Sequence, residues 1–240
     1  MFERNNGIII ACDVETIEEL RSLVEIARDS SVVVGYKVGF SLALRFGLPT
    51  VVTEVKDLTA APVIYDHQKA GTDIPQMGQP FAACCADSGV DGVIVFPQAG
   101  PETMRSFLQA IGERGMTPIV GGVMTHPKYL QSDGGYLADT APESIYATGL
   151  ELGVSHFVLP GNKPEMMQRY AAGVFAAAHT VSLLMPGIGR QGGKVAEAFR
   201  AARPHRSYAI VGTTIYGAAD PQSALADFGG QIEECEHGSA

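Results

Sequence analysis

Three charged side chains lie close together in the segment YDHQKAGTDIP, which covers residues 65–75. Asp66, Lys69 and Asp73 follow the short apolar run APVIY, whose composition is typical of a buried strand. Removing charges from water is costly unless opposite charges pair. Two acids and a lysine directly after such a strand therefore indicate a site that uses charge, although the ordinary surface charges of a solvated loop would give the same pattern.

A second lysine, Lys37, lies inside the apolar run VGYKVGF at residues 34–40. A lysine in a buried strand needs an acidic partner. Asp13, at the end of the first apolar run, and Asp66 are the candidates. Lys37 would then begin a charged array of alternating sign that continues into segment 65–75. A purely structural ion pair at this place is the alternative.

Two glycine-rich loops have the composition of an anion-binding site, MPGIGRQGG at 185–193 and VGTTIYG at 211–217. Glycine lets the backbone approach a ligand closely, and successive amide groups can bind an anion. Arg190 adds a cation to the first loop, and Gly212 and Thr213 offer amide groups in the second. Together the loops indicate a phosphorylated substrate, and a pair of tight turns without a ligand is the alternative.

These residues must be positioned by a chain in which short apolar runs alternate with helical patterns. Eight nearly continuous runs are typical of strands buried on both faces, and they cover residues 7–13, 31–40, 61–66, 90–96, 116–124, 154–160, 179–186 and 207–212. Helices are predicted over 16–27, where Thr16 and Glu19 form a capping box, over 101–114 and over 142–152. The pattern predicts an α/β fold, a (β/α)8 TIM barrel, with an open doubly wound sheet as the alternative.

No linker or change in composition divides the chain, so residues 1–240 are expected to form a single domain with a flexible tail from about residue 233. In such a barrel the functional groups lie at the C-terminal ends of the strands. Asp13, Lys37 and Asp66 fall there, as does Thr125 after the fifth run. Phosphate sites in barrels commonly use the loops after strands seven and eight, which are the two glycine-rich loops of this chain.

Composition limits the possible partners. The net charge is −9, and the 17 lysines and arginines form no evident cluster, so no nucleic-acid-binding groove is expected. No stretch is long enough to span a membrane, and the apolar run in the first ten residues is too short for a signal peptide. The four cysteines form neither a zinc-binding pattern nor a disulfide framework. These features predict a cytoplasmic protein.

The chain resembles the orotidine 5'-phosphate decarboxylase family over essentially its whole length. Six pieces carry the resemblance, in this order: Asp13 after the first apolar run, the lysine of VGYKVGF, the Asp/Lys/Asp-Ile-Pro segment, Thr-His-Pro at 125–127, PGIGRQGG at 186–193 and VGTTIYGAADP at 211–221. The resemblance implies a homodimer that removes CO2 from a nucleotide, orotidine monophosphate, to give uridine monophosphate. It implies no metal and no organic cofactor.

Carried over residue by residue, the resemblance implies four catalytic roles. Lys69 would protonate C6 of the pyrimidine as CO2 leaves, and Asp66 would disfavour the substrate carboxylate in its ground state. Lys37 would hold Asp66 and contact the ribose, and Asp73 would cross the dimer interface into the partner's site. A carbanion at C6 has no resonance sink, so a preorganised cation has to stabilise it.

The resemblance also implies which residues bind the substrate. Asp13 would contact the ribose, and Thr125 stands where the family has a serine that binds the pyrimidine edge. The phosphate side of the site would be formed by the loops after the seventh and eighth strands, through Pro186, Gly189, Arg190, Gln191, Gly192, Gly212 and Thr213.

The sequence departs from the family pattern in two places. The family segment is usually Asp-x-Lys-x-x-Asp, one residue shorter in each gap, so Asp66 must end its strand, or a bulge must follow it, for Lys69 to face the site. The family usually has a phosphate-binding arginine at the position of Thr213, and Arg190 could compensate. A related magnesium-dependent sugar-phosphate decarboxylase or aldolase, which EDTA would inhibit, and a non-catalytic nucleotide-binding barrel are the alternatives.

Overall fold

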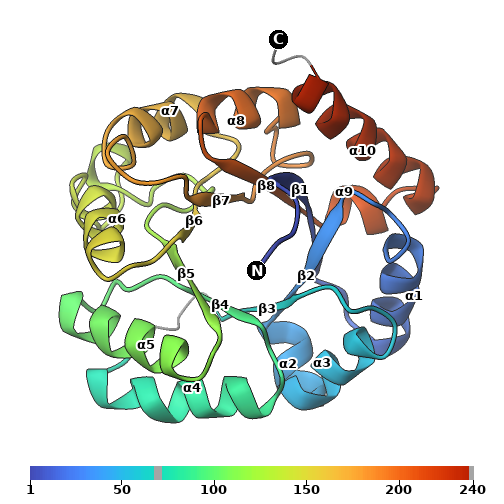
Figure 1. Cartoon of the computed structure of the whole chain (residues 1–240), viewed down its shortest axis with the longest axis horizontal. Helices are drawn as coiled ribbons and strands as arrows, with labels where there is room; N and C mark the ends of the chain where they lie inside the picture. The colour runs from blue at the N-terminus through green and yellow to red at the C-terminus, as the bar shows by residue number, and fades with distance from the viewer. Residues whose placement is uncertain (68–71, 238–240) are drawn as a thin grey trace.

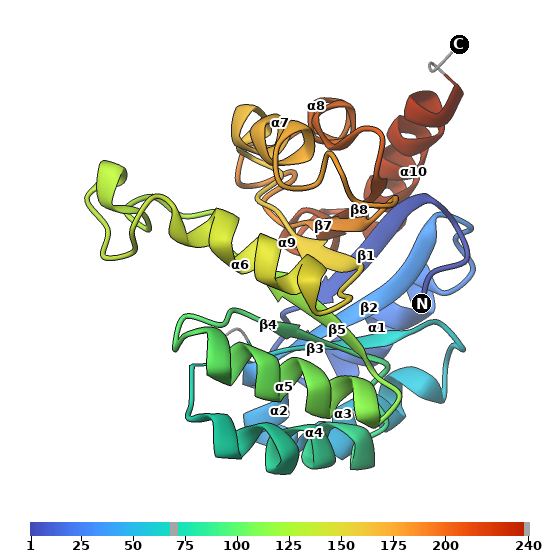
Figure 2. The same cartoon turned by 60° about the vertical axis from the view of Figure 1, so that its left-hand side comes forward.

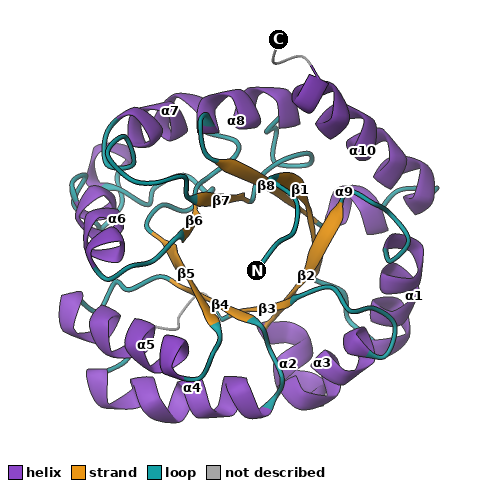
Figure 3. Ribbon diagram, in the orientation of Figure 1, coloured by secondary structure: helices purple, strands orange, loops and turns teal. Residues whose placement is uncertain are grey.

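Eight parallel strands form a closed barrel in the order β1 to β8. The computed structural model describes residues 1–67 and 72–237, and it shows the strands as an inner ring inside a layer of helices (Figures 1 and 3). The strands are β1 (Asn6–Cys12), β2 (Val33–Gly39), β3 (Val63–Asp66), β4 (Gly92–Val95), β5 (Thr117–Gly121), β6 (His156–Val158), β7 (Ser182–Met185) and β8 (Arg206–Val211). The predicted barrel is confirmed, since each apolar run contains one strand to within a residue.

Helices fill the connections between strands. They are α1 (Ile17–Ala27), α2 (Phe40–Phe46), α3 (Leu48–Lys56), α4 (Gly78–Asp87), α5 (Pro101–Glu113), α6 (Ala141–Glu151), α7 (Pro164–Ala172), α8 (Val195–Ala202), α9 (Thr213–Tyr216) and α10 (Pro221–His237), with the short 3-10 turns η1 (Pro75–Met77) and η2 (Gln131–Asp133). The helices predicted from the sequence are α1, α5 and α6. Thr16 and Glu19 form the expected capping box at the start of α1. Helix α10 continues to His237, so the chain is still helical where a flexible tail was expected from about residue 233.

Two apolar layers hold the barrel together. Successive side chains of a strand point to opposite faces, so β1 directs Ile9 and Ala11 inward and Ile8 and Ile10 outward. The inner layer fills the barrel, and its buried members are Ile9, Ala11, Val34, Ile64, Ile94, Phe96, Ile119, Val158, Leu184, Tyr208 and Ile210. The outer layer lies between the strands and the helices. The strands are therefore fixed on both faces, which gives a rigid frame for groups at their ends.

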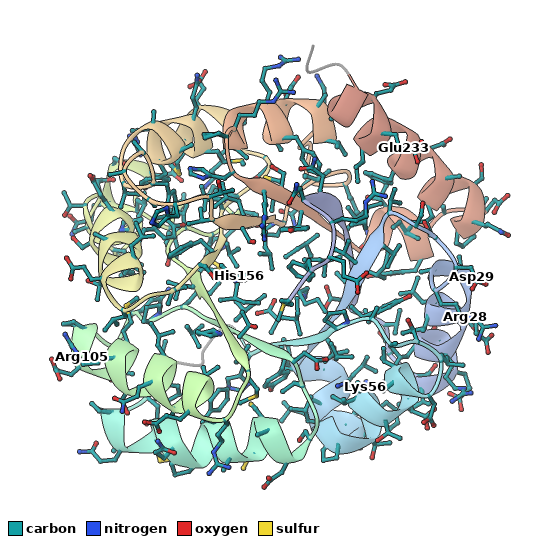
Figure 4. The ribbon with its side chains drawn as sticks, in the orientation of Figure 1. Arg28, Asp29, Lys56, Arg105, His156 and Glu233 are labelled. Atoms are coloured by element: carbon teal, nitrogen blue, oxygen red, sulfur yellow. The ribbon has the colours of Figure 1, made fainter. Side chains whose placement is uncertain are left out.

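The N-terminal residues close one end of the barrel. The ring of Phe2 packs against Tyr208, with centroids 4.4 Å apart, and against His156 at 5.9 Å. His156, labelled in Figure 4, begins β6. Burial, together with the positive charges of the N-terminus and Arg206, lowers the pKa of His156 to about 4. The imidazole is therefore neutral at pH 7, and the N-terminal ends of the strands are covered by packed side chains.

Within residues 1–67 and 72–237, no helix combines the length and the apolar character that crossing a membrane requires. The four cysteines are free thiols; Cys12 and Cys85 are buried, Cys84 is exposed and Cys235 is half-buried. Burial raises the pKa of the Cys12 and Cys85 thiols to about 12. These two thiols stay protonated at neutral pH, so they act as small packing groups rather than nucleophiles.

Two helical glycines give a matched test of the packing. A Cβ added at Gly78, the first residue of α4, would lie 2.6 Å from Ser106 Oγ and 2.9 Å from the Ser106 carbonyl oxygen on α5. A Cβ at Gly112 on α5 would have no neighbour within 4 Å. We expect Gly78→Ala to lower the free energy of unfolding by about 1–3 kcal/mol through overpacking. Gly112→Ala should leave it unchanged or raise it by up to about 1 kcal/mol. Urea denaturation measures both, and equal effects would show that α4 and α5 do not pack this closely.

Candidate functional site

The centre of the candidate site is a lysine between two carboxylates. Lys37 Nζ lies 3.2 Å from Asp13 Oδ1 and 3.2 Å from Asp66 Oδ2. Lys37 and Asp66 are each only 7% exposed, whereas the side chain of Asp13 is about half exposed. The structure therefore brings together the three charges that the sequence analysis placed on neighbouring strands. The buried pair is Lys37 and Asp66, and Asp13 completes it from the solvent side.

Strand register explains why these three side chains meet. Lys37 of β2 lies opposite Ala11 of β1 and Ile64 of β3. Asp13 and Asp66 come two residues after those partners, so the period of two places both on the inner face, one step closer to the C-terminal end of the barrel. The long side chain of Lys37 spans that step. Small residues make room for it, because Ala11 lies beside Lys37 and a Cβ at Gly39 would lie 3.1 Å from Asp13 Oδ1.

Charge balance at this centre favours an ionised lysine. Burial alone would lower the pKa of Lys37, but the charges of Asp66 and Asp13 and their hydrogen bonds raise it above its ordinary value. Lys37 is therefore a fixed cation rather than a proton donor at neutral pH. Its ammonium group also occupies the space between the two carboxylates, where a divalent cation bound by both would have to sit. In the described parts of the chain, no group of three or more His, Cys, Asp or Glu side chains is placed so that it could hold a metal ion.

The two acids of segment 65–75 lie in different places in the structure. Strand β3 ends at Asp66, which meets one of the two conditions that the unusual spacing imposed. Lys69, the expected proton donor, lies outside the described residues. Asp73 is exposed, and its Oδ1 accepts a hydrogen bond from the amide of Ile74 at 2.7 Å. Asp73 lines a different cavity from Lys37, so in a single subunit it stands apart from the buried charges.

His67 also lies away from the charged centre. Its Nδ1 forms a 2.6 Å hydrogen bond with the hydroxyl of Tyr65, and its ring packs against Phe81. Tyr65 and His67 alternate with Asp66 along the chain, so they belong to the face of β3 that turns toward the helices.

A cavity of about 200 Å³ opens next to Lys37 at the C-terminal end of the strands. Among the residues proposed from the sequence, its lining contains Asp13, Lys37, Asp66, Thr125, Pro186, Arg190, Gln191, Gly212 and Thr213. Apolar side chains supply the rest of the wall, chiefly Ile94, Phe96, Val123, Val158 and Ile210. The cavity thus combines a charged side from β1 to β3, an apolar wall, and a side built from the loops after β7 and β8.

The loop after β7 is a compact turn that depends on its glycines. Gly187, Gly189 and Gly192 have φ values of 91°, 86° and 89°, which side-chain-bearing residues rarely adopt. Gly192 N donates to Gly189 O and Gly193 N donates to Gly187 O, at 2.8 and 3.1 Å. Gly189 and Gly192 do not line the cavity. They shape the loop that presents Arg190 and Gln191. The amide groups of Gly189 and Gly192 donate hydrogen bonds within the loop.

Further hydrogen bonds tie the loops after β7, β8 and β1 to one another. Arg190 N donates to Thr214 Oγ1 at 3.0 Å. The hydroxyls of Thr213 and Tyr216 lie 2.9 Å apart, and Tyr216 Oη donates to the carbonyl oxygen of Asp13 at 3.3 Å. Arg190 lines the cavity beside Thr213, the position where the family usually has arginine. Arg190 is therefore available on the side of the cavity where a phosphate-binding cation was expected.

Two residues that the sequence analysis did not identify hold the segment around Thr125. Lys163 Nζ donates to the carbonyl oxygens of Met124 and His126, at 3.0 and 3.4 Å. Asn162 Nδ2 donates to the carbonyl oxygen of Thr125 at 3.2 Å. Three successive carbonyl groups are thus fixed from the loop after β6. The long β5–α6 connection that follows projects from the barrel (Figure 2). The only sequence signal for this contact is the pair Asn162-Lys163 after a strand end. Its partners are backbone carbonyl groups, which every residue has, so the sequence does not identify them.

Comparison with known proteins assigns this architecture to a family. The family model described as orotidine 5'-phosphate decarboxylase / HUMPS family matches residues 6–228. A curated relative from Methanosarcina mazei, named orotidine 5'-phosphate decarboxylase, is 29% identical over 96% of this chain and 97% of its own. One of the same name from Thermococcus kodakarensis is 31% identical over 90% and 92%. The crystal structure of orotidine 5'-phosphate decarboxylase from Pyrococcus horikoshii superposes with a TM-score of 0.78 at 26% identity, covering 94% and 99% of the two chains. The chain belongs to the orotidine 5'-phosphate decarboxylase / HUMPS family.

Proposed function

We propose that this protein decarboxylates orotidine 5'-phosphate to uridine 5'-phosphate, as a carbon–carbon lyase of pyrimidine biosynthesis. The observation that carries the proposal is the Asp13–Lys37–Asp66 cluster, with its buried Lys37–Asp66 pair, at the edge of a cavity whose other side is built from two glycine-rich loops. This arrangement suits a substrate with an anionic group at each end. The names of the curated relatives support the decarboxylase over the sugar-phosphate lyase of the same barrel.

Electrostatics supports this chemistry. Asp66 is buried and ends β3 inside the cavity, so a substrate carboxylate placed beside it is disfavoured until it leaves as CO2. Lys37 fixes the position of the Asp66 side chain through the 3.2 Å contact. We propose that Lys69, three residues later, supplies the cation that stabilises the carbanion at C6 and the proton that replaces CO2.

The remaining lining residues have matching roles in the proposal. The apolar wall of Ile94, Val123 and Val158 suits a flat pyrimidine ring, with Thr125 at its polar edge. Arg190, Gln191 and the first amide groups of α9 would bind the phosphate, since the first amides of a helix have no partner within it. Binding energy from the phosphate then helps to hold the carboxylate against Asp66.

We further propose that the active form is a cytoplasmic homodimer in which Asp73 contributes to the partner's site. Large apolar side chains are exposed after the C-terminal ends of β2 and β3: Phe40 is 62% exposed, Leu44 79% and Ile74 59%. Exposed apolar groups gathered at one end of a domain are typical of a protein interface. Asp73 precedes Ile74 and does not line the cavity beside Lys37 in its own subunit, which fits a role across that interface.

Turnover of orotidine 5'-phosphate, followed by ultraviolet absorbance, tests the proposed function. We expect the purified protein to convert the substrate at an unchanged rate in the presence of EDTA. We expect Lys69→Ala to abolish turnover, a loss of at least about 10³-fold, because one preorganised charge at a reacting centre contributes rate factors of this size. Lys56→Ala, which removes an exposed lysine paired with Asp91, is the matched control. An inactive wild-type protein that is folded would refute the proposal, and inhibition by EDTA would favour the magnesium-dependent lyase.

Lys163 should affect turnover through Thr125. Lys163→Met keeps the length of the side chain but removes the donor to Met124 and His126. We expect kcat/KM to fall about 10-fold or more, since small displacements of positioning groups are costly, and Lys163→Arg should recover part of the loss. Lys128→Met, in the loop that contains Thr125, is the control because the side chain of Lys128 is exposed. Equal kcat/KM for Lys163→Met and wild type would show that this loop does not position the substrate.

A charge placed on the exposed apolar surface should break the dimer. We expect Leu44→Glu to shift the protein from dimer to monomer in analytical ultracentrifugation, because an unpaired charge in an interface costs several kcal/mol, roughly 2–5. Leu152→Glu is the control, since Leu152 follows α6 at the opposite end of the barrel. A Leu44→Glu protein that remains dimeric, or a monomeric wild type, would place the interface elsewhere or remove it.

A further inference from the structure

A second and larger cavity lies at the opposite end of the barrel. Its volume is about 1030 Å³, compared with about 200 Å³ for the candidate site. Residues 3–6 before and within β1, Thr180 before β7 and Arg206 at the start of β8 contribute to its walls. These are the N-terminal ends of strands, so the cavity is separate from the Lys37 site. Helices α8 and α10, which flank it, are neighbours in the outer ring of helices in Figure 1.

This cavity is lined by arginines in a protein that is acidic overall. Arg4, Arg200, Arg203 and Arg206 lie in its walls, against two glutamates, Glu3 and Glu234. The whole chain carries a net charge of −9, so the local charge is reversed. No basic cluster is evident along the sequence, because Arg4 is distant in the chain from Arg200, Arg203 and Arg206. The fold brings these four residues to one concave surface, which we call the arginine cavity.

The walls of the arginine cavity are held in place by hydrogen bonds. Tyr208 Oη donates to the carbonyl oxygen of Arg4 at 2.7 Å, and Ser207 N donates to the carbonyl oxygen of Asn5 at 3.0 Å. Arg203 Nη2 donates to the carbonyl oxygen of Cys235 on α10 at 3.5 Å. The N-terminal segment, β8 and α10 are thereby joined. Because the walls of this charged cavity are already fixed, binding a ligand does not require them to become ordered.

Two of the arginines have no carboxylate partner among the residues that the structure describes. No ion pair within 4.0 Å joins Arg200 or Arg206 to an acidic side chain there, whereas Arg21, Arg28, Arg45 and Arg105 each have one. Arg200 lies in the last turn of α8, and Arg206 is the first residue of β8. Guanidinium groups present several N–H donors in a plane and match the oxygens of phosphate groups.

We propose that the arginine cavity binds a small soluble anion with several negative charges, of the kind carried by a triphosphate group. The volume suits a small molecule of this size. The cationic groups come from three separate segments and converge on one space, which favours a compact polyanion over an extended chain. Neutral donors from Asn5, Ser207 and Gln231 line the same space and can complete the hydrogen bonding. This inference does not depend on the proposed decarboxylase activity.

Calorimetric titration with inorganic triphosphate at low ionic strength tests the proposal. We expect binding to the wild-type protein that weakens as salt is added. The double variant Arg200→Gln/Arg206→Gln should bind at least about tenfold more weakly, since it removes two charged donors. Arg190→Gln, in the loop beside the Lys37 site, should bind triphosphate with wild-type affinity at the arginine cavity, because it lies at the other end of the barrel.

The matched control is Arg105→Gln. Arg105 is an exposed arginine on α5, and Figure 4 shows it across the barrel from Glu233 on α10. The Arg105→Gln variant should bind triphosphate with the same affinity as the wild type. Both Arg200 and Arg206 are exposed, and glutamine is a good helix former, so the thermal unfolding midpoint should be retained. If the double variant does not fold, Arg200→Gln alone should still weaken binding several-fold. Four outcomes would each overturn the proposal. The wild type does not bind triphosphate, or the double variant binds with the same affinity as the wild type. Alternatively, Arg105→Gln loses as much affinity as the double variant, or only Arg190→Gln loses affinity.

Discussion

The ion cluster of Asp13, Lys37 and Asp66 is the constraint on which the site depends. Lys37 and Asp66 are almost completely buried, so each needs the other: removing one partner of a buried pair costs about 3–5 kcal/mol. An apolar pair of similar volume would pack at least as well. The presence of ions here is therefore better explained by their use than by stability. The barrel supplies what such a cluster needs, which is a register that places three side chains within 3.2 Å contacts.

The barrel interior is uncharged at one end and carries a charged pair at the other. At the N-terminal ends of the strands, Phe2 covers Tyr208 and a neutral His156, and the interior is closed. At the C-terminal ends the same inward-facing positions become Lys37 and Asp66, and the cavity opens. The two cavities share no lining residue, so a ligand in one does not contact the charged side chains of the other. The barrel can thus carry the candidate site and the arginine cavity without one requiring changes in the other.

The sequence was sufficient to predict the barrel and nine of the residues that line the cavity, because both depend on local patterns. Apolar runs mark the strands, and polar residues at their ends mark the C-terminal face. Three features could not be predicted. The role of Gly189 and Gly192 in shaping a loop rather than lining the cavity depends on where their amides point. Lys163 acts on carbonyl groups, which every residue has. Arg4 joins Arg200 and Arg206 only through the closure of the barrel.

The longer spacing between Asp66 and Asp73 can be accommodated because both ends of the segment are fixed by other means. Asp66 is held by Lys37 at the end of β3. The carbonyl oxygen of Asp73 accepts a hydrogen bond from Thr103 Oγ1 on α5 at 2.8 Å. Two additional residues add at most about 7 Å of chain between these anchors. Since that length follows the strand, it does not shift the register of Asp66. Asp66 and Asp73 are therefore each positioned by a contact of their own, and neither depends on the length of chain between them.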